Sequence, residues 1–430
     1  MYSPRLLKGV EKMGLRVAVV SPFIDKRHGT ERCIAEEVER LARDYDYEIH
    51  LYSQWVEDVE GVKRFDREVQ MSDGEPRKGA IYWHKVPDVP GPHLIKYLWW
   101  FLANQMVRWW DRRFKGLCFD LVYSPGINCL DADVISVHIV FAEFYRQVKD
   151  RLSLWCNPIK SWARLLHRRI YYRLIMLLER KIYPKGKAIL VVVSHKVAHA
   201  LKCHYQLQDN FPIVYGSVDV RKFNPQIRAR LRVKARQTLR LPENAFALLL
   251  VGNDWKKKGL DCLLEAVGGL GNSNLWVLVV GRDDPTLYHA TIKRWGLHDR
   301  VLFLPPRPDV EFYYAAADAY VGPSLEDAFP LPPLEGMACG LPVIVSRHSG
   351  TSEIITHGVD GFILKDLQDA EELAHLIRFL YENSNLRHRM GENASQTAKQ
   401  YTWEKHTQKM HETFLLAAKD KGQREVMDRK

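Results

Sequence analysis

Short apolar runs alternate with longer amphipathic stretches along this chain, and the whole alternation occurs twice. The apolar runs are rich in valine, isoleucine and leucine and occupy residues 15–20, 48–53, 119–125, 133–139, 188–194, 246–252, 275–281, 300–304, 319–323 and 341–345. Continuous apolar runs of this length are typical of parallel strands that are buried on both faces. Helical patterns lie between several of them, at 30–43, 258–270, 285–296 and 332–339. The repeated order strand–helix–strand predicts an α/β protein with doubly wound parallel sheets.

The alternation pauses between residues 205 and 245, where turn residues are frequent and helix signals are few. A chain of 430 residues is also too long for one ordinary core. We therefore predict a first domain at 1–212, a second at 213–400, and a C-terminal helix within 401–430 that either caps the second domain or crosses back to the first. Two doubly wound domains facing each other across a cleft would place a ligand site at the carboxyl ends of their strands.

Charge and cysteine content limit the partners and the compartment. The formal net charge of +11 favours anionic partners such as nucleotides, acidic lipid surfaces or nucleic acid. Seven cysteines, an odd number without CxxC spacing, predict reduced thiols in a cytoplasmic protein and no metal site. The N-terminus lacks a signal-peptide pattern, and no apolar window reaches the roughly 18 residues of a membrane span.

The first strand is followed by a loop that could hold an anion. Gly29 and Thr30 precede an amphipathic helix, and the free N–H groups of a helix start favour a negative group. A complete GxGxxG is absent, which weakens the case for a dinucleotide. The alternative is an ordinary turn in which Thr30 is the N-cap.

A second loop, at 252–259, contains Asn253 and then Lys256, Lys257 and Lys258 at the start of a helix. Cations at this end of a helix oppose its macrodipole unless something negative lies among them. A diphosphate would satisfy the lysines. The alternative is a solvated basic loop.

The segment 323–346, PSLEDAFPLPPLEGMACGLPVIVS, places Asp327 and Glu335 on either side of a proline-rich loop. Prolines such as Pro330 stiffen this loop and leave few free amides at the following helix start, among them that of Leu331. A constant separation between two carboxylates suits gripping a polyhydroxyl ligand at two places. The structural alternative is that Glu335 lies in the first helical turn, where the dipole favours an acid, and that Asp327 is an ordinary loop residue.

His138 lies near the carboxyl end of the apolar run 133–139. A lone histidine in such a strand is either a satisfied core residue or an active-site group, and the residues by themselves leave both interpretations open.

Taken together, these segments resemble family 4 retaining glycosyltransferases. That family has an acid, seven residues, a glutamate, a small-residue helix and a G-x-P-V strand; Asp327 and Glu335 fit this frame, with aspartate where the family usually has glutamate. Other segments similar to the family, in the right order, are HGTERCIAEEVERLA (28–42), VISVH (134–138), VDVRKFNP (218–225) and GNDWKKKGLD (252–261). The resemblance covers residues 15 to about 415.

The resemblance implies a GT-B fold of two Rossmann-like domains and a hexosyltransferase that uses a UDP- or GDP-linked sugar with retention at the anomeric carbon. It implies that Glu335 binds the ribose, Asp327 the donor-sugar hydroxyls, and Lys257 and Lys258 the diphosphate, with His138 as an active-site histidine. The other expected donor-binding residues are Gly29, Thr30, Asn253, Pro330 and Leu331. No metal or other cofactor is expected, because lysines can stabilise the charge of the leaving group.

The first domain of such enzymes usually selects the acceptor. Here the stretches 93–116 and 158–187 mix aromatic with basic residues, a composition that suits an anionic membrane surface. We therefore expect peripheral binding to the cytoplasmic face of a membrane and a glycan or lipid-linked acceptor, such as lipopolysaccharide core or a polyprenol-linked glycan. The alternative is a pair of core helices with arginines on the wet face.

Three alternative functions remain to be weighed: a nucleotide-sugar epimerase, a phosphorylase and a nucleic-acid-binding protein. A nucleotide-sugar 2-epimerase shares the fold, and a phosphorylase would need a lysine-bound pyridoxal site, for which the sequence offers no support. A basic nucleic-acid-binding protein is suggested by the charge and by tryptophans among basic residues. The paired acids around a rigid loop would then have no purpose, so we expect no nucleic-acid partner.

Overall fold

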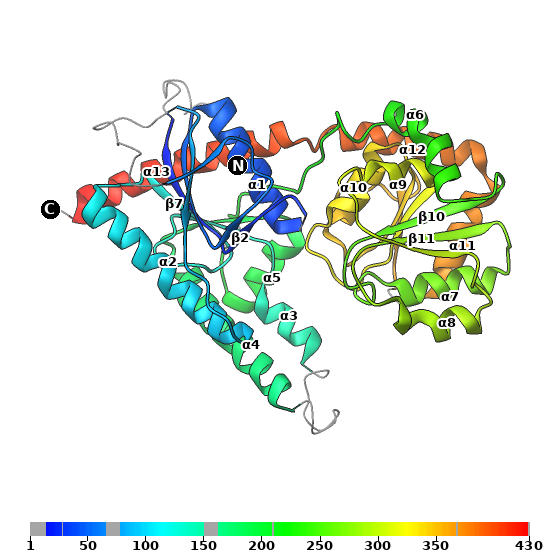
Figure 1. The fold of residues 1–430 in the computed structure, drawn as a ribbon, viewed down its shortest axis with the longest axis horizontal. Helices are drawn as coiled ribbons and strands as arrows, with labels where there is room; N and C mark the ends of the chain where they lie inside the picture. The colour runs from blue at the N-terminus through cyan, green and yellow to red at the C-terminus, as the bar shows by residue number, and fades with distance from the viewer. Residues whose placement is uncertain are drawn as a thin grey trace. The chain divides into compact units, whose positions relative to one another are not determined.

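Two parallel sheets organise the chain, which we describe from a computed structural model covering residues 14–27, 29–65, 78–149, 162–208, 210–366 and 369–428. The chain divides into unit 1, which comprises residues Met1–Val214 and His406–Lys430, and unit 2, Tyr215–Lys405. Each unit contains one of the sheets (Figure 1). The predicted fold class, α/β with two doubly wound Rossmann-like sheets, is confirmed.

The sheet of unit 1 has seven strands in the order β5-β6-β3-β1-β7-β8-β9, all paired in parallel. In chain order the strands are β1 (Arg16–Val20), β3 (Glu48–Ser53), β5 (Val62–Arg64), β6 (Ile81–Lys85), β7 (Leu121–Pro125), β8 (Val134–Val137) and β9 (Ile189–Val192). A separate short pair is formed by β2 (Phe23–Ile24) and β4 (Trp55–Val56). The helical segments are α1 (Gly29–Tyr45), α2 (His93–Lys115), α3 (Phe141–Val148), α4 (Trp162–Ile182), η3 (Tyr183–Lys185) and α5 (His195–Tyr205).

The sheet of unit 2 has six parallel strands in the order β12-β11-β10-β13-β14-β15. They are β10 (Phe246–Val251), β11 (Leu275–Val280), β12 (Val301–Leu304), β13 (Ala319–Gly322), β14 (Val343–Ser346) and β15 (Gly361–Leu364). The helical segments are α6 (Pro225–Thr238), α7 (Leu260–Leu270), η4 (Pro285–Tyr288), α8 (His289–Arg294), α9 (Glu311–Ala316), α10 (Leu331–Ala338), η5 (Gly350–Ile354), α11 (Ala370–Glu382) and α12 (Ser384–Ala398).

The last helix, α13 (Trp403–Asp428), belongs to unit 1 from His406 onward. Its residues Met410, Phe414 and Ala417 are buried in the same apolar cluster as the strands β1, β3 and β7. Tyr47 packs on Phe414 with ring centroids 6.3 Å apart. Of the two placements that we considered for this helix, the structure therefore has the one on the first unit.

Two local expectations differ from the structure. The region 205–245 contains α6, which begins at Pro225, and Asn224 caps it by accepting a hydrogen bond from the Ile227 N–H at 2.8 Å. The Asn-Pro pair is a recognisable helix start, but five basic residues in α6 obscure the apolar periodicity of the helix. The single helix expected at 285–296 is instead the short η4 followed by α8.

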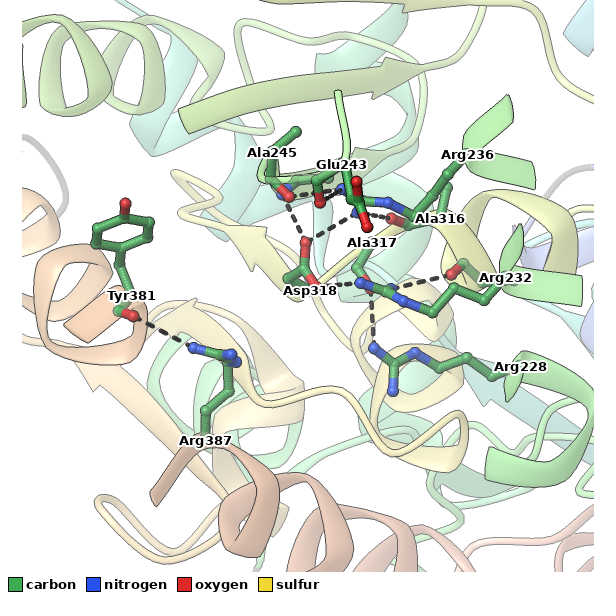
Figure 2. A network of polar contacts seen from close by, with 12 residues as sticks. Arg228, Arg232, Arg236, Glu243, Ala245, Ala316, Ala317, Asp318, Tyr381 and Arg387 are labelled. Atoms are coloured by element: carbon green, nitrogen blue, oxygen red, sulfur yellow. Dashed lines mark hydrogen bonds and ion pairs between the residues drawn. The ribbon is translucent and has the colours of Figure 1, made fainter. Parts of the chain in front are cut away.

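A cluster of arginines fixes α6 to the rest of unit 2 (Figure 2). Arg232 and Arg236 both contact the Asp318 carboxylate, at 2.6 and 3.3 Å, and Arg228 donates to the Ala317 carbonyl at 2.9 Å. The Ala317 carbonyl lies at the C-terminal end of α9, where the helix dipole favours cations. Burial, followed by the nearby Arg232, lowers the pKa of Arg228 to about 10. The cluster lies just before β13, at the opposite end of that strand from the loop with Asp327.

The described cysteines are Cys33, Cys118, Cys129, Cys203, Cys262 and Cys339, and all of them are free. Cys156 lies outside the described residues. Among the helices that the structure describes, none combines the length and the apolar character needed to cross a membrane.

Candidate active site

The two loops that follow β10 and β13 meet at the carboxyl edge of the sheet in unit 2. The two strands are neighbours, and the Leu325 N–H donates to the Lys257 carbonyl at 2.8 Å. Gly259 has a φ of +82°, and a Cβ at that position would lie 2.1 Å from the Pro323 carbonyl oxygen. A glycine is needed there for both reasons. It allows the lysine loop to approach the loop that carries Asp327.

Lys258 and Asp327 form an ion pair between these loops, from Nζ to Oδ2. Their side chains are 17% and 21% exposed, so the pair is partly shielded yet reachable from solvent. A third loop, after β14, holds the backbone of Asp327 on both sides. The Asp327 N–H donates to the His348 carbonyl at 3.3 Å, and the Asp327 carbonyl accepts from the Gly350 N–H at 2.8 Å.

Glu335 is buried, with 3% of its surface exposed, and it accepts a hydrogen bond from the Tyr314 hydroxyl at 2.7 Å. Because α10 begins at Leu331, Glu335 is its fifth residue and lies beyond the first turn. The expectation that it lies in the first turn was wrong, and the helix dipole is therefore a weaker reason for an acid here. Burial and then the charge of Glu335 raise the pKa of Tyr314 well above its usual range, so the phenol remains a donor.

The start of α10 has an unusually small number of free amides. Its N-cap is Pro330, and prolines also occupy positions 332 and 333, so Leu331 alone among these four residues carries an N–H. The loop before the helix is anchored at both ends. Ser346 Oγ donates to the Ser324 carbonyl at 2.5 Å, and Thr351 Oγ1 donates to the Pro330 carbonyl at 2.9 Å.

The remaining residues of the lysine loop differ in their surroundings. Asn253 is exposed, and its Oδ1 accepts from the Arg282 N–H at 2.8 Å, which joins the loops after β10 and β11. Lys256 is exposed, whereas Lys257 is half-buried. The carboxylates of Asp131 and Asp133, on the N-terminal side of β8, form ion pairs with Arg108 and with Lys421.

In unit 1, α1 starts at Gly29, so Thr30 is its second residue rather than its N-cap. The N-cap alternative for Thr30 was therefore wrong. A Cβ on Gly29 would meet no atom within 4 Å, so open space adjoins this helix start. His28 lies outside the described residues.

His138 is half-buried and lies directly after β8, where its Nε2 is 3.4 Å from Ser136 Oγ. Burial lowers the pKa of His138 to about 4, with Glu37 acting in the opposite direction. The imidazole is therefore neutral at physiological pH, and it can offer one hydrogen-bond donor and one acceptor but no charge.

Within unit 2 the structure brings together the predicted residues Lys257, Lys258 and Asp327. It places Pro330 and Leu331 at the start of the adjoining helix α10, and Glu335 beyond its first turn. Gly29, Thr30 and His138 belong to unit 1. Sequence reasoning missed Tyr314, for which the chain offers no local signal. It also missed Thr351, although this residue lies in the GTSEII segment that follows the motif.

Comparisons with known proteins bear on these segments. Residues 232–397 match the family Glycosyl transferases group 1. The lipopolysaccharide glucosyltransferase WaaG of Escherichia coli K12 is 31% identical over 229 residues, which are 52% of this chain and 61% of that protein. The D-inositol 3-phosphate glycosyltransferase of Corynebacterium kroppenstedtii is 31% identical over half of each chain. The chain thus spans about half to three fifths of the length of these curated relatives.

Solved structures show the same fold. A crystal structure of WaaG, a glycosyltransferase involved in lipopolysaccharide biosynthesis, has a TM-score of 0.71 at 22% identity, covering 92% of this chain and 98% of that one. The predicted resemblance to glycosyltransferases of the GT-B fold is confirmed. The matched segment, residues 232–397, includes Lys257, Lys258, Asp327 and Glu335.

Proposed function

We propose that this protein is a retaining glycosyltransferase that moves a hexose from a UDP- or GDP-linked donor to a glycan or lipid-linked acceptor. The observation that carries this proposal is the Lys258–Asp327 ion pair at the carboxyl edge of a parallel sheet, followed along the chain by the buried Glu335 of α10. The match of residues 232–397 to group 1 glycosyl transferases supports the reaction class. Retention is supported by the resemblance of the motif around Asp327 and Glu335.

The charges around the loop suit departure of a nucleoside diphosphate. Lys258 is positioned by Asp327 before any ligand arrives, and Lys257 lies next to it on the same turn. Fixed cations stabilise negative charge as it develops on a leaving group, and they need no reorganisation when the bond breaks. We propose that the two lysines supply this stabilisation without a metal or another cofactor.

The carboxylates would hold the two ends of the donor. Asp327 is partly exposed and suits the hydroxyls of a sugar, whereas Glu335 is buried and oriented by Tyr314, which suits one fixed contact with a ribose. The single N–H at the start of α10, that of Leu331, and the neighbouring Pro330 would line the donor, with Asn253 at the nucleotide end. In unit 1, Gly29 and Thr30 offer open space at a helix start, and neutral His138 would bond a sugar hydroxyl.

A donor panel tests this proposal. Hydrolysis and transfer are measured with UDP- and GDP-linked sugars, first for the unaltered chain and then for Asp327→Ala and Glu335→Ala. We expect one donor to be consumed and both variants to lose transfer. Full transfer by both variants would refute the assignment of the site, and failure of every donor would refute the reaction class.

The acceptor side of the proposal rests on α2 and α4, which lie side by side in unit 1 (Figure 1). The Leu94 N–H donates to His167 Nε2 at 3.2 Å, and the rings of Tyr97 and Tyr171 are 5.6 Å apart. Large apolar side chains are exposed on both helices: Ile95, Leu98, Trp99, Leu102, Met106, Trp109, Trp110 and Phe114 on α2, and Leu166, Ile170 and Leu177 on α4. We call this set the apolar–basic face, together with the exposed cations named next.

The charge on this face has one sign. Exposed cations are Lys96, Arg112, Arg113, Lys115, Arg164, Arg168, Arg173, Arg180 and Lys181. The only acids of the two helices are Asp111 and Glu179, and both are buried, at 2% and 0% exposure. Helices that expose apolar side chains at helical spacing among cations are typical of binding to an anionic bilayer.

We therefore propose that the protein binds peripherally to the cytoplasmic face of a membrane and takes a lipid-linked acceptor there. The resemblance to a lipopolysaccharide glucosyltransferase supports such an acceptor. Anionic lipid fits this face because its aliphatic side chains, such as Leu102 and Met106, can bury into acyl chains, whereas stacking on nucleic-acid bases would use only the aromatic rings of the face.

A further inference from the structure

A buried row of hydrogen-bonding side chains leads from His138 through unit 1 to α13. Ser136 Oγ lies 3.4 Å from His138 Nε2 and 2.9 Å from the Tyr123 hydroxyl. The Tyr123 hydroxyl in turn lies 2.9 Å from Glu37 Oε2. The other carboxylate oxygen of Glu37 lies 2.7 Å from His406 Nε2. The row joins β8, β7, α1 and α13, and Glu37, Tyr123 and Ser136 are each at least 97% buried.

The chemistry of Glu37 gives this row a direction. A carboxylate only accepts hydrogen bonds, so the Tyr123 hydroxyl and His406 Nε2 must both donate to it. Having used its proton, the Tyr123 oxygen accepts from the Ser136 hydroxyl. Ser136 has then used its own proton, and its Oγ accepts from His138 Nε2–H. The donor or acceptor role of each group is thus fixed by the hydrogen bond that its neighbour in the row already makes.

We propose that Glu37 is a positioning residue that fixes His138 as the Nε2–H tautomer and leaves its Nδ1 as a bare acceptor. The bare Nδ1 would accept a hydrogen bond from a hydroxyl of the donor sugar, and this part of the proposal rests on the proposed function. His406 is the second donor to Glu37 and orients that carboxylate from α13. Tyr123 and Ser136 transmit the orientation from Glu37 to the imidazole of His138.

The alternative role for the row is purely structural, because the same contacts fasten α1 and α13 to the sheet. A structural role would be seen as a loss of stability on substitution, with no change in the tautomer of His138. The tautomer is therefore the measurement that separates the two roles, and it does not require a substrate.

The experiment uses the full chain labelled with 15N-histidine. His138 is assigned as the signal that is lost in His138→Gln, and its tautomer is read from the two ring-nitrogen shifts, because a protonated and a bare nitrogen differ widely. For the unaltered protein we expect protonated Nε2 and bare Nδ1. In Ser136→Ala, a small change next to the ring, we expect the preference for this tautomer to fall by about tenfold, the equivalent of one net hydrogen bond.

Tyr123→Phe breaks the row further from the ring, and Glu37→Gln replaces the carboxylate by an amide that can also donate. We expect both to weaken the same preference. The matched control is Glu39→Gln, also on α1 and buried, whose carboxylate accepts instead from Lys26 and from the Glu60 N–H, both at 2.8 Å. We expect this control to leave the His138 signals unchanged.

Two results would overturn the inference: protonated Nδ1 in the unaltered protein, or wild-type His138 shifts in Ser136→Ala. Transfer assays add a separate readout, in which Ser136→Ala lowers kcat while donor KM changes little. If the tautomer behaves as expected but no donor is consumed, the proposed function fails and the positioning role of Glu37 remains.

Discussion

Lys258 Nζ donates to Asp327 Oδ2, which joins two loops whose ion-paired residues are 69 positions apart in the chain. Substitutions of the two residues should therefore have opposite effects on nucleotide binding. A diphosphate competes with Asp327 for the charge of Lys258, whereas a sugar hydroxyl needs the carboxylate. The two residues can therefore be separated experimentally by the sign of their effects.

We expect Lys258→Gln to weaken binding of UDP or GDP and to lower transfer by about 10²-fold or more, as for other groups that stabilise a leaving charge. Asp327→Asn should strengthen or preserve nucleotide binding, because Lys258 loses its competing anion, while transfer still falls. Calorimetric titration with UDP and GDP and a transfer assay measure both. The exposed pair Arg307–Asp309 supplies the control, since Asp309→Asn should change neither. Weaker nucleotide binding by Asp327→Asn would contradict this account.

The hydroxyl of Tyr314 orients the buried carboxylate of Glu335. Tyr314→Phe removes that donor and leaves Glu335 short of a hydrogen bond, which costs about 1–3 kcal/mol of unfolding free energy. We also expect a higher KM for the nucleotide sugar. The neighbouring Tyr313 donates its hydroxyl to the Pro305 carbonyl at 2.7 Å, so Tyr313→Phe is a matched control that should leave KM unchanged. Equal KM values for the two variants would remove Tyr314 from the site.

Gly259 lets the lysine loop contact the Pro323 carbonyl. Gly259→Ala adds a methyl group 2.1 Å from that oxygen at a φ of +82°, so both a clash and backbone strain oppose it. Gly271 has a φ of +62° with no atom within 4 Å of its Cβ position, so Gly271→Ala meets strain alone, about 1–2 kcal/mol. We expect the midpoint of thermal unfolding to fall further for Gly259→Ala, and nucleotide binding to weaken only there. Equal unfolding midpoints for Gly259→Ala and Gly271→Ala would show that the loops of Gly259 and Pro323 can move apart without loss of stability.

Glu179 makes the stability of unit 1 depend on pH. It accepts from the Phe141 N–H at 3.0 Å and from the Tyr205 hydroxyl, and burial raises its pKa from 4.5 to about 7. The folded protein therefore keeps a proton that the unfolded chain has already lost above pH 4.5. The contribution of Glu179 to the free energy of unfolding is therefore complete below about pH 4.5. It is lost as the pH rises toward 7, which lowers the free energy of unfolding by on the order of 3 kcal/mol at most.

We expect Glu179→Gln to flatten this dependence, because the amide cannot titrate. Unfolding midpoints in urea at pH 5 and pH 8 measure the effect. The substitution of the exposed Glu382 by glutamine is the control and should keep the wild-type slope. An unchanged slope in Glu179→Gln would place the pH dependence elsewhere in the chain.

Membrane binding is tested on the apolar–basic face. Leu102 and Met106, 59% and 66% exposed on α2, are replaced together by glutamate. We expect this double variant to stop floating with vesicles that contain anionic lipid, because two apolar side chains that would insert into the bilayer are replaced by negative charges. Val233 and Leu287 of unit 2 are equally exposed, and their double replacement by glutamate alters the net charge by the same amount. Flotation of both variants, or of neither, would contradict binding through α2.

Much of the fold was legible in the sequence because buried parallel strands need continuous apolar runs. All ten predicted runs contain a strand. The strands that were missed, β2, β4, β5, β6 and β15, are short or carry polar residues whose burial depends on distant partners. His84 in β6 is an example: it is buried against Asp111 of α2 at 2.7 Å, and a sequence pattern cannot show that contact. Likewise α6 was missed because its buried face carries arginines in place of apolar residues. These arginines donate hydrogen bonds to carbonyls and to a carboxylate 80 or more residues away in the chain.

By itself the sequence determined the alternation of strands and helices, and it placed Asp327 and Glu335 on either side of a proline-stiffened segment. Both follow from local backbone geometry and proline chemistry, which act over a few residues. The tertiary structure decided what each side chain faces. It paired Lys258 with Asp327, set Tyr314 against Glu335, packed α13 on unit 1, and lined up Glu37, Tyr123 and Ser136 behind His138. Those contacts join residues far apart in the chain, and only the packing of the sheets and helices brings them within hydrogen-bonding distance.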